Sequence, residues 1–127
     1  MINVVGAIIR NKEGKILIAK RNLEKSQGGL WEFPGGKIEE GETKEHAIER
    51  EIKEELDMDI KADSLFDAHT FEYPNRTINL IVMNCTMIGD TYRALEHEEL
   101  KWVNEDEMKN FEFAPADVYF TEKLMSK

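Results

Sequence analysis

The chain has 127 residues, of which 41% are hydrophobic, and its 26 acidic and 17 basic side chains give a formal net charge of −9. This length suits one domain, which we expect to span residues 1–127. The hydrophobic share is enough for a packed core and excludes global disorder. The negative charge excludes a sequence-independent grip on DNA or RNA, which needs clustered Lys and Arg side chains.

The acidic residues are concentrated in one stretch of the chain. Residues 39–59 hold ten acidic and three basic side chains, so this segment carries a net charge of −7 and the rest of the chain only −2. Crowded carboxylates repel one another and cost stability. A stretch of 21 residues with most of the acidity therefore needs a structural or functional reason.

The composition also restricts the redox chemistry and the compartment. Cys85 is the only cysteine, so neither an intrachain disulfide nor a cysteine metal cluster can form. Its apolar neighbours predict a buried strand thiol. The first residues lack the basic start and long apolar run of a signal peptide, and no apolar stretch approaches the ~20 residues that span a bilayer. We therefore expect a cytoplasmic protein with no membrane partner.

The pattern along the chain predicts one mixed α/β domain with a mainly antiparallel sheet. The expected elements, in chain order, are a strand over 2–10, a turn over 11–14, a strand over 15–21, a loop over 22–29, a short strand over 30–33 ended by 34–36, a helix over 44–57, a strand over 63–73, a turn over 73–76, a strand over 77–88, a strand over 100–103, a brief helix after 104 and a C-terminal helix from 115 towards 125. The first two strands are expected to form a hairpin. Thr43 is the expected N-cap of the first helix, and Pro115 belongs in the first turn of the last.

The helix over 44–57 has two distinct faces. Its apolar stripe, expected to face the core, consists of Ile48, Ile52 and Leu56. An adjacent face carries three carboxylates at spacing i, i+3 and i+4, which are Glu51, Glu54 and Glu55. These carboxylates either form a solvated face or bind a hard divalent cation, which prefers oxygen ligands. Gly35 and Gly36 favour the second interpretation, because glycine lets the backbone turn tightly and approach a ligand.

The full spacing decides between these interpretations. Gly36 is followed after five residues by Glu42 and after seven more by Arg50-Glu51-Ile52-Lys53-Glu54-Glu55-Leu56-Asp57-Met58. This pattern of 23 positions resembles the Nudix box of hydrolases that act on nucleoside diphosphates linked to another group. The one departure is Asp57, where the family usually has Gly. Asp tolerates the left-handed conformation better than most residues, so we expect a small geometric change and an intact metal site.

The resemblance implies an α/β/α Nudix fold, a mixed sheet between helices, and a site for Mg²⁺ or Mn²⁺. It makes Glu51 and Glu55 the primary metal ligands, with Glu54 and the carbonyl of Gly35 or Gly36 as further ligands. Arg50 is expected in the catalytic machinery, where it and the supporting residue Glu42 orient the helix carboxylates. The chemistry implied is attack by water on phosphorus, with a carboxylate accepting the proton. The expected bases are Glu51, Glu54 and, from the loop before Trp102, Glu96, which is also an expected metal ligand.

Likeness to the MutT-like branch extends over almost the whole chain. Residues 4–9, 17–21 and 29–37 are similar to that branch's opening hairpin and its approach to the box, and Ala114-Pro115-Ala116-Asp117 is similar to the ending of bacterial (d)CTP pyrophosphohydrolases. The expected substrate-binding residues are Arg21, Lys37 and Asp117. A carboxylate at 117 would accept a hydrogen bond from the cytosine amine, but guanine N1 and N2 also suit it, so (d)CTP and 8-oxo-dGTP both remain open. The same residue could simply be an acid at a helix N-terminus.

The resemblance therefore implies a nucleoside triphosphate pyrophosphohydrolase with a role in nucleotide pool sanitation. The expected partner is a small-molecule nucleotide rather than a nucleic-acid polymer, and the chain is expected to be a monomer or a homodimer. Hydrolysis of ADP-ribose or dinucleoside polyphosphates is an alternative, for which Tyr73 and Pro74 lie in the relevant region, although they also suit a hairpin turn. An RNA-cap hydrolase is disfavoured by the acidic charge. A non-catalytic Nudix-fold nucleotide-binding module is the alternative of a different class.

Overall fold

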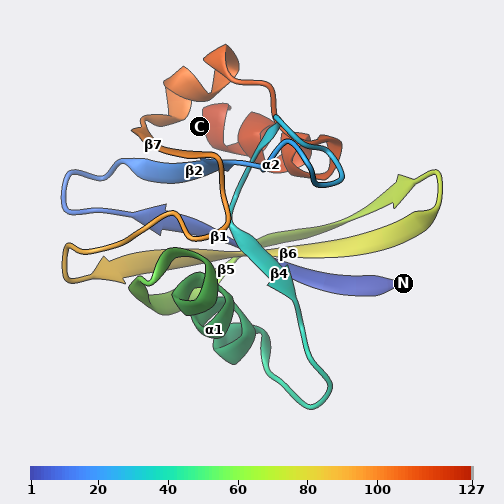
Figure 1. Ribbon diagram of the computed structural model, residues 1–127, viewed down its shortest axis with the longest axis horizontal. Helices are drawn as coiled ribbons and strands as arrows, with labels where there is room; N and C mark the ends of the chain where they lie inside the picture. Colours follow the sequence, from blue (N-terminus) through green and yellow to red (C-terminus); the bar gives the residue numbers. More distant parts are fainter. Residues whose placement is uncertain (127) are drawn as a thin grey trace.

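The computed structural model describes residues 1–126, whose strands form one mixed sheet with helices on both of its faces (Figure 1). The elements are β1 (Ile2–Arg10), β2 (Ile16–Lys20), β3 (Trp31–Glu32), β4 (Gly35–Lys37), α1 (Lys44–Leu56), β5 (Asp59–Tyr73), β6 (Arg76–Ile88), β7 (Glu99–Val103), the 3-10 helix η1 (Glu105–Asn110) and α2 (Pro115–Met125). Most of these elements lie where the sequence predicts them. The expected turn over residues 73–76 joins β5 to β6.

The sheet is organised around β1. One edge of β1 pairs in parallel with β6 over its whole length, from Ile2 opposite Ile78 to Arg10 opposite Thr86. The other edge is divided between two antiparallel neighbours, because β4 pairs with its first half and β2 joins only at Arg10. The remaining pairs are also antiparallel, with β2 between β3 and β7, and β5 beside β6. The predicted mainly antiparallel sheet therefore contains one parallel pair at its centre.

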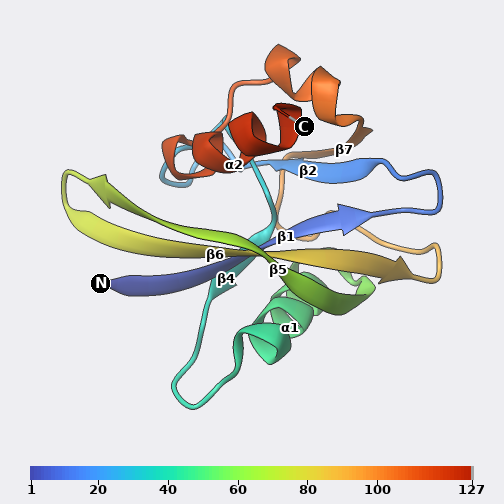
Figure 2. The ribbon, with the colours of Figure 1, turned by 180° about the vertical axis from the view of Figure 1, so that it is seen from behind.

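Helices cover the two faces of the sheet, α1 on one side and α2 with η1 on the other (Figures 1 and 2). Alternate side chains of β1 enter the two cores, as the two-residue period of a strand requires: Ile8 packs on the α2 side, and Ala7 and Ile9 pack on the α1 side. The predicted apolar stripe of α1 is fully buried, as expected, through Ile48, Ile52 and Leu56. No helix within residues 1–126 combines the length and apolar character needed to cross a membrane.

The ends of α1 are defined by local chemistry. The Thr43 hydroxyl accepts a hydrogen bond from the His46 N–H at 3.1 Å, which confirms the expected N-cap. At the other end Asp57 adopts the left-handed conformation, with φ 49° and ψ 40°, and its N–H donates to the Lys53 carbonyl at 3.0 Å. The acid thus occupies the backbone position for which glycine is the usual residue, as expected.

Two elements differ from their predicted form. The predicted strand over 63–73 begins four residues earlier, at Asp59, as the edge strand β5, which pairs only with β6 and contains register shifts at Ala62/Ser64 and Leu65/Asp67. Such shifts interrupt the alternation on which strand prediction relies. Residues 35–37 pair with β1 as the short strand β4, where the sequence predicted only the end of a strand. Their two glycines obscure the strand signal.

The single thiol gives a direct test of the core. Cys85 lies on β6, is buried on the α1 side of the sheet and has its pKa raised to about 12 by burial. Since the thiolate is the reactive form, we expect no measurable reaction with a disulfide reagent at pH 8 in the native state and complete reaction in urea. Rapid labelling of the folded protein would contradict this packing.

Candidate functional site

The loop and helix that carry the acidic stretch begin at β4, where two glycines let side chains approach the backbone. A Cβ atom added to Gly36 would collide with the Glu51 carboxylate, and one added to Gly35 would collide with the carbonyl oxygen of Val5. Gly35 is therefore required for the pairing of β4 with β1. Gly36 lets a carboxylate of α1 lie directly against the β4 backbone.

Arg50 holds this part of the site together. Its Nε and Nη2 donate to the two oxygens of Glu42 at 2.7 and 2.9 Å, and Nη2 also donates to the Lys37 carbonyl at 3.2 Å. The paired guanidinium, together with the N–H of Glu39, lowers the pKa of Glu42 to about 2. The same bond to Glu42 raises the pKa of Arg50, so the pair remains ionised across the physiological range.

Arg50 also reaches two of the three helix carboxylates. Its Nη1 donates to Glu51 at 3.0 Å and to Glu54 at 3.3 Å. The Glu51 side chain is nearly buried between α1 and β4, whereas the Glu54 side chain is 56% exposed. The predicted acidic face is therefore divided into environments of unequal depth. One cation offsets the repulsion between these two carboxylates.

Glu55 has no such compensation. The residue is only 8% exposed, and within the described chain its Oε1 atom is buried without a hydrogen-bond partner. Burial, and next the neighbouring Glu51 carboxylate, raise the pKa of Glu55 to about 10. A buried polar atom without a partner is costly and calls for an explanation. A hard divalent cation satisfies this oxygen chemically, because carboxylate oxygens are its preferred ligands.

The loop that connects β6 to β7 also lies beside Glu55. The N–H groups of Arg93 and Leu95 donate to the carbonyls of Leu56 and Glu55 at 2.7 and 3.0 Å, so the loop caps the end of α1. The Arg93 guanidinium also pairs with Asp57, 3.0 Å from Oδ2. The Asp57 side chain, which a glycine would lack, thus adds an ion pair to the backbone hydrogen bonds between the end of α1 and the loop that carries Glu96.

This loop closes a small pocket, here called the carboxylate pocket, of about 90 Å³. It is lined by Arg21, Lys25, Glu32, Gly35, Glu55, Glu96 and His97. Glu96 lies at its rim, where it pairs with Lys25 at 3.4 Å. Across residues 1–126 no three His, Cys, Asp or Glu side chains converge closely enough to form a complete ligand set. The predicted metal ligands instead occupy two adjoining places, with Glu51 and Glu54 held by Arg50, and Glu55 and Glu96 around the pocket.

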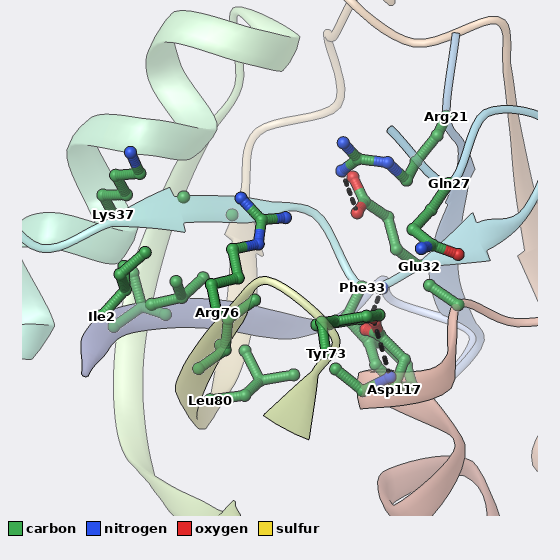
Figure 3. A pocket seen from close by; sticks show the side chains of 17 residues that line it. Ile2, Arg21, Gln27, Glu32, Phe33, Lys37, Tyr73, Arg76, Leu80 and Asp117 are labelled. Carbon is green, nitrogen blue, oxygen red and sulfur yellow. Dashed lines mark hydrogen bonds and ion pairs between the residues drawn. The ribbon is translucent and has the colours of Figure 1, made fainter. Parts of the chain in front are cut away.

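A second, larger pocket of about 170 Å³ adjoins the first, and we call it the nucleotide pocket after the ligand that the sequence predicts (Figure 3). All three predicted substrate-binding residues line it, together with both glycines of β4; they are Arg21, Lys37 and Asp117. Three residues, Arg21, Glu32 and Gly35, line both pockets. Cations on its wall are notable in a chain with a net charge of −9 and suit an anionic ligand.

Asp117 lies at the bottom of the nucleotide pocket, in the first turn of α2. It is 6% exposed, and its Oδ1 accepts a hydrogen bond from the Phe33 N–H at 3.1 Å. Burial raises the pKa of this carboxyl well above its usual range, and Glu32 adds to the shift. The position agrees with both sequence interpretations, a base-contacting carboxylate and an acid at a helix N-terminus, because Asp117 lies in the first turn of α2 and also lines the cavity.

Glu32 and Arg76 also line the nucleotide pocket and were not predicted, whereas Tyr73, which lines it too, was considered only for the alternative substrates. Tyr73 accepts a hydrogen bond from the Ala116 N–H at 3.2 Å, and the Arg76 guanidinium lies 5.8 Å from the Tyr73 ring centre. The turn that holds Tyr73 and Arg76 was favoured as a hairpin connection, and its contact with α2 depends on tertiary packing. Glu32 had a readable signal, because a lone acid between two buried aromatic residues must point to the opposite face of its strand.

The chain is similar to a known protein family and to curated proteins. The family model described as NUDIX domain matches residues 5–123. A CTP pyrophosphohydrolase of Escherichia coli strain K12 is 38% identical over 126 residues, which cover 99% of this chain and 93% of that protein. An 8-oxo-dGTP diphosphatase of Haemophilus influenzae is 31% identical over 128 residues, covering 100% of this chain and 93% of that protein.

Solved structures give the same picture. The solution structure of the E. coli ORF135 protein matches with a TM-score of 0.86 and 38% identity, covering 99% of this chain and 89% of that one. The crystal structure of a MutT protein from Methanosarcina mazei matches with a TM-score of 0.84 and 28% identity, covering 98% and 91%. The mixed sheet flanked by helices is therefore the fold of MutT structures, as the sequence predicted.

Glycine at position 36 gives a first test of the site. In Gly36→Ala the new methyl group displaces the Glu51 carboxylate, so we expect Mg²⁺ affinity, measured by isothermal titration calorimetry, to fall about tenfold or more. Gly6→Ala is the matched control, because its Cβ would meet only ordinary contacts at 3.6 Å or more. Equal Mg²⁺ affinity in all three proteins would contradict the placement of Glu51.

The ion pair of Glu42 gives a second test, through the pH dependence of stability. Because its pKa falls from the ordinary 4.5 to about 2 in the folded state, Glu42 stabilises the fold above pH 4.5, and this contribution is lost as the pH falls towards 2. We expect Glu42→Gln to unfold at lower urea than wild type at pH 7, with the difference narrowing below pH 4.5. Glu40→Gln, an exposed neighbour, is the control. A difference that stayed constant with pH would refute the pairing.

Proposed function

This chain belongs to the NUDIX domain family, and we propose that it is a metal-dependent nucleoside triphosphate pyrophosphohydrolase that converts a (d)NTP and water to a (d)NMP and pyrophosphate. The observation that carries the proposal is that the two pockets adjoin and share lining residues. A cavity with cationic groups on its wall shares Arg21, Glu32 and Gly35 with a second pocket, where an oxygen of the buried Glu55 carboxylate has no partner among the described residues. The relatives named CTP pyrophosphohydrolase and 8-oxo-dGTP diphosphatase support the same substrate class.

We propose Mg²⁺ or Mn²⁺ as the divalent metal ion that members of this family use. Its ligands would come from Glu51, Glu54, Glu55 and Glu96 together with the carbonyl of Gly35 or Gly36, an all-oxygen set that suits a hard cation. The orphaned Oε1 of Glu55 supports this assignment. When bound, such an ion neutralises phosphate oxygens, polarises phosphorus and lowers the pKa of water.

The protein's own residues perform three tasks in this reaction. Arg21 and Lys37 bind the phosphates from the wall of the nucleotide pocket, and Asp117 contacts the base at its bottom. Arg50 and Glu42 hold the α1 carboxylates in fixed orientations, through the bonds of 2.7 to 3.3 Å described above.

The third task is to accept the proton of the attacking water. Water attacks one of the two phosphorus atoms of the anhydride that joins the nucleoside monophosphate to pyrophosphate. The bond from that phosphorus to the bridging oxygen breaks, and the bridging oxygen leaves with the other product. The proton of the attacking water passes to a carboxylate, for which Glu51, Glu54 and Glu96 are the candidates. Exposure favours Glu54 and Glu96, because Glu51 is nearly buried between Arg50 and β4.

The setting that fits these properties is the cytoplasm, where a single domain over residues 1–127, as a monomer or homodimer, would act in nucleotide pool sanitation. The candidate substrates are (d)CTP and a modified nucleotide such as 8-oxo-dGTP. No nucleic-acid polymer is proposed as a partner, since an acidic chain repels it.

A substrate panel with product analysis tests the proposal. CTP, dCTP, 8-oxo-dGTP, ADP-ribose and a dinucleoside polyphosphate are each incubated with enzyme and Mg²⁺, and the products are identified by ³¹P NMR. We expect pyrophosphate and a nucleoside monophosphate from at least one triphosphate. Cleavage of ADP-ribose or of the dinucleoside polyphosphate alone would favour the alternative substrates. No turnover of any compound, with nucleotide still bound, would favour a binding module.

The helix carboxylates give a prediction about the reaction itself. Glu51→Gln and Glu55→Gln keep side-chain size but remove the anionic oxygens, so we expect each to lower Mg²⁺-dependent kcat/KM by a factor on the order of a hundred or more. Glu45→Gln, on the exposed first turn of α1, is the control and should keep full activity. Circular dichroism shows whether each variant is folded. Full activity in both test variants would exclude the metal assignment.

Asp117 gives a prediction about base preference. Replacing it with Asn keeps the acceptor for the Phe33 N–H but adds an amide donor at the pocket floor. We expect Asp117→Asn to shift the ratio of kcat/KM for dCTP over 8-oxo-dGTP by about tenfold, because one base hydrogen bond is exchanged. An unchanged ratio would leave Asp117 with its structural role alone.

A further inference from the structure

His97 lines the carboxylate pocket and is nearly buried, with a side chain only 6% exposed. Its Nε2 lies 2.9 Å from Oε2 of Glu32 and 3.9 Å from Oε1 of Glu55. A carboxylate oxygen accepts hydrogen bonds, so Nε2 must be the protonated nitrogen that donates to Glu32. The other ring nitrogen, Nδ1, is buried and has no partner among the described residues. The ring therefore makes one hydrogen bond, and that bond is to Glu32.

Glu32 in turn is bound at both of its oxygens. Oε2 accepts from His97, and Oε1 accepts from Nη1 of Arg21 at 2.8 Å, as Figure 3 shows for the second pair. Arg21 is fixed at its other end, because its Nε donates to the Ser26 carbonyl at 2.7 Å. The result is a chain of contacts that runs from the loop beside Glu55, through His97 and Glu32, to a guanidinium on the wall of the nucleotide pocket.

We propose that His97 is a positioning residue that orients Arg21 for the nucleotide phosphates by holding the Glu32 carboxylate. This inference rests on the proposed function, because it assigns Arg21 to phosphate binding. The physical reason is that a carboxylate with one hydrogen-bond partner can rotate, whereas one bound at both oxygens cannot. A guanidinium paired with a fixed carboxylate is pre-organised, so binding costs less side-chain entropy. His97 thereby links the loop that carries Glu96 to the phosphate-binding wall.

The alternative is that His97 merely fastens the loop to β3. Two substitutions separate these roles. His97→Leu fills a similar volume without a donor and leaves the Glu32 oxygen without a partner. His97→Gln has an amide nitrogen that can reach the place of Nε2 and donate the same hydrogen bond. His69→Gln is the control, since His69 is an exposed residue of β5 whose ring stacks on Tyr119, outside both pockets.

The kinetic readout is the division of the effect between KM and kcat. For the triphosphate that the wild type hydrolyses, we expect His97→Leu to raise KM about tenfold with kcat changed by less than about threefold, because ground-state phosphate binding is weakened. His97→Gln should restore KM to within about threefold of wild type. A KM in His97→Leu equal to that of wild type would overturn the proposal. So would equal impairment of the Leu and Gln variants, which would mean a packing role.

A second readout needs no substrate and keeps failure of this inference distinct from failure of the proposed function. In ¹⁵N-labelled protein without nucleotide, the Arg21 Nε–H should give a resolved signal, since it is bound to the Ser26 carbonyl. We expect this signal to shift and broaden in His97→Leu and to stay in place in His97→Gln and His69→Gln. An unchanged Arg21 signal in His97→Leu overturns the positioning role even if hydrolysis is found. A shifted signal supports it even if another substrate is the true one.

Discussion

One guanidinium holds the candidate site together. Arg50 bonds to Glu42 from the loop, to Glu51 and Glu54 from its own helix and to the carbonyl of Lys37 on β4, so three segments depend on a single side chain. Without a cation there, the acidic stretch would repel itself, because opposite charge at contact distance is what makes clustered carboxylates tolerable. The fold supplies the rest by burying the other face of α1 against the sheet.

Arg50 makes no hydrogen bond or ion pair with Glu55, the third carboxylate of the acidic face of α1. Glu55 is buried with an oxygen that lacks a partner, and around it stand the carboxylates of Glu32 and Glu96. Such an arrangement in a cleft is typical of a functional site, and a bound ligand of opposite charge would offset it. The charge of −9 thus acquires a meaning that composition alone does not convey. It disfavours a nucleic-acid polymer, yet the acidic helix contributes Glu55 to a pocket that adjoins a second one with cationic residues on its wall, where we propose that a small polyphosphate binds.

Much of this could be predicted from sequence, for identifiable reasons. The spacing from Gly36 to Met58 and the apolar stripe of α1 are local patterns, so the acidic helix, its Thr43 cap and the left-handed Asp57 were all predictable. The start of β5 was not, because register shifts hide its alternation, and neither was β4, whose glycines give a weak strand signal. The hydrogen bonds from Arg21 and His97 to Glu32 join residues that are far apart in the chain, and no local pattern relates them.

We propose that a divalent cation binds where β4, the end of α1 and the Glu96 loop meet. Paramagnetic broadening of amide signals by substoichiometric Mn²⁺ measures this location directly in ¹⁵N-labelled protein. We expect the amides of Gly35, Gly36, Glu55 and Glu96 to broaden first. Broadening centred on residues 39–46, where exposed acids also gather, or no selective broadening at all, would contradict it.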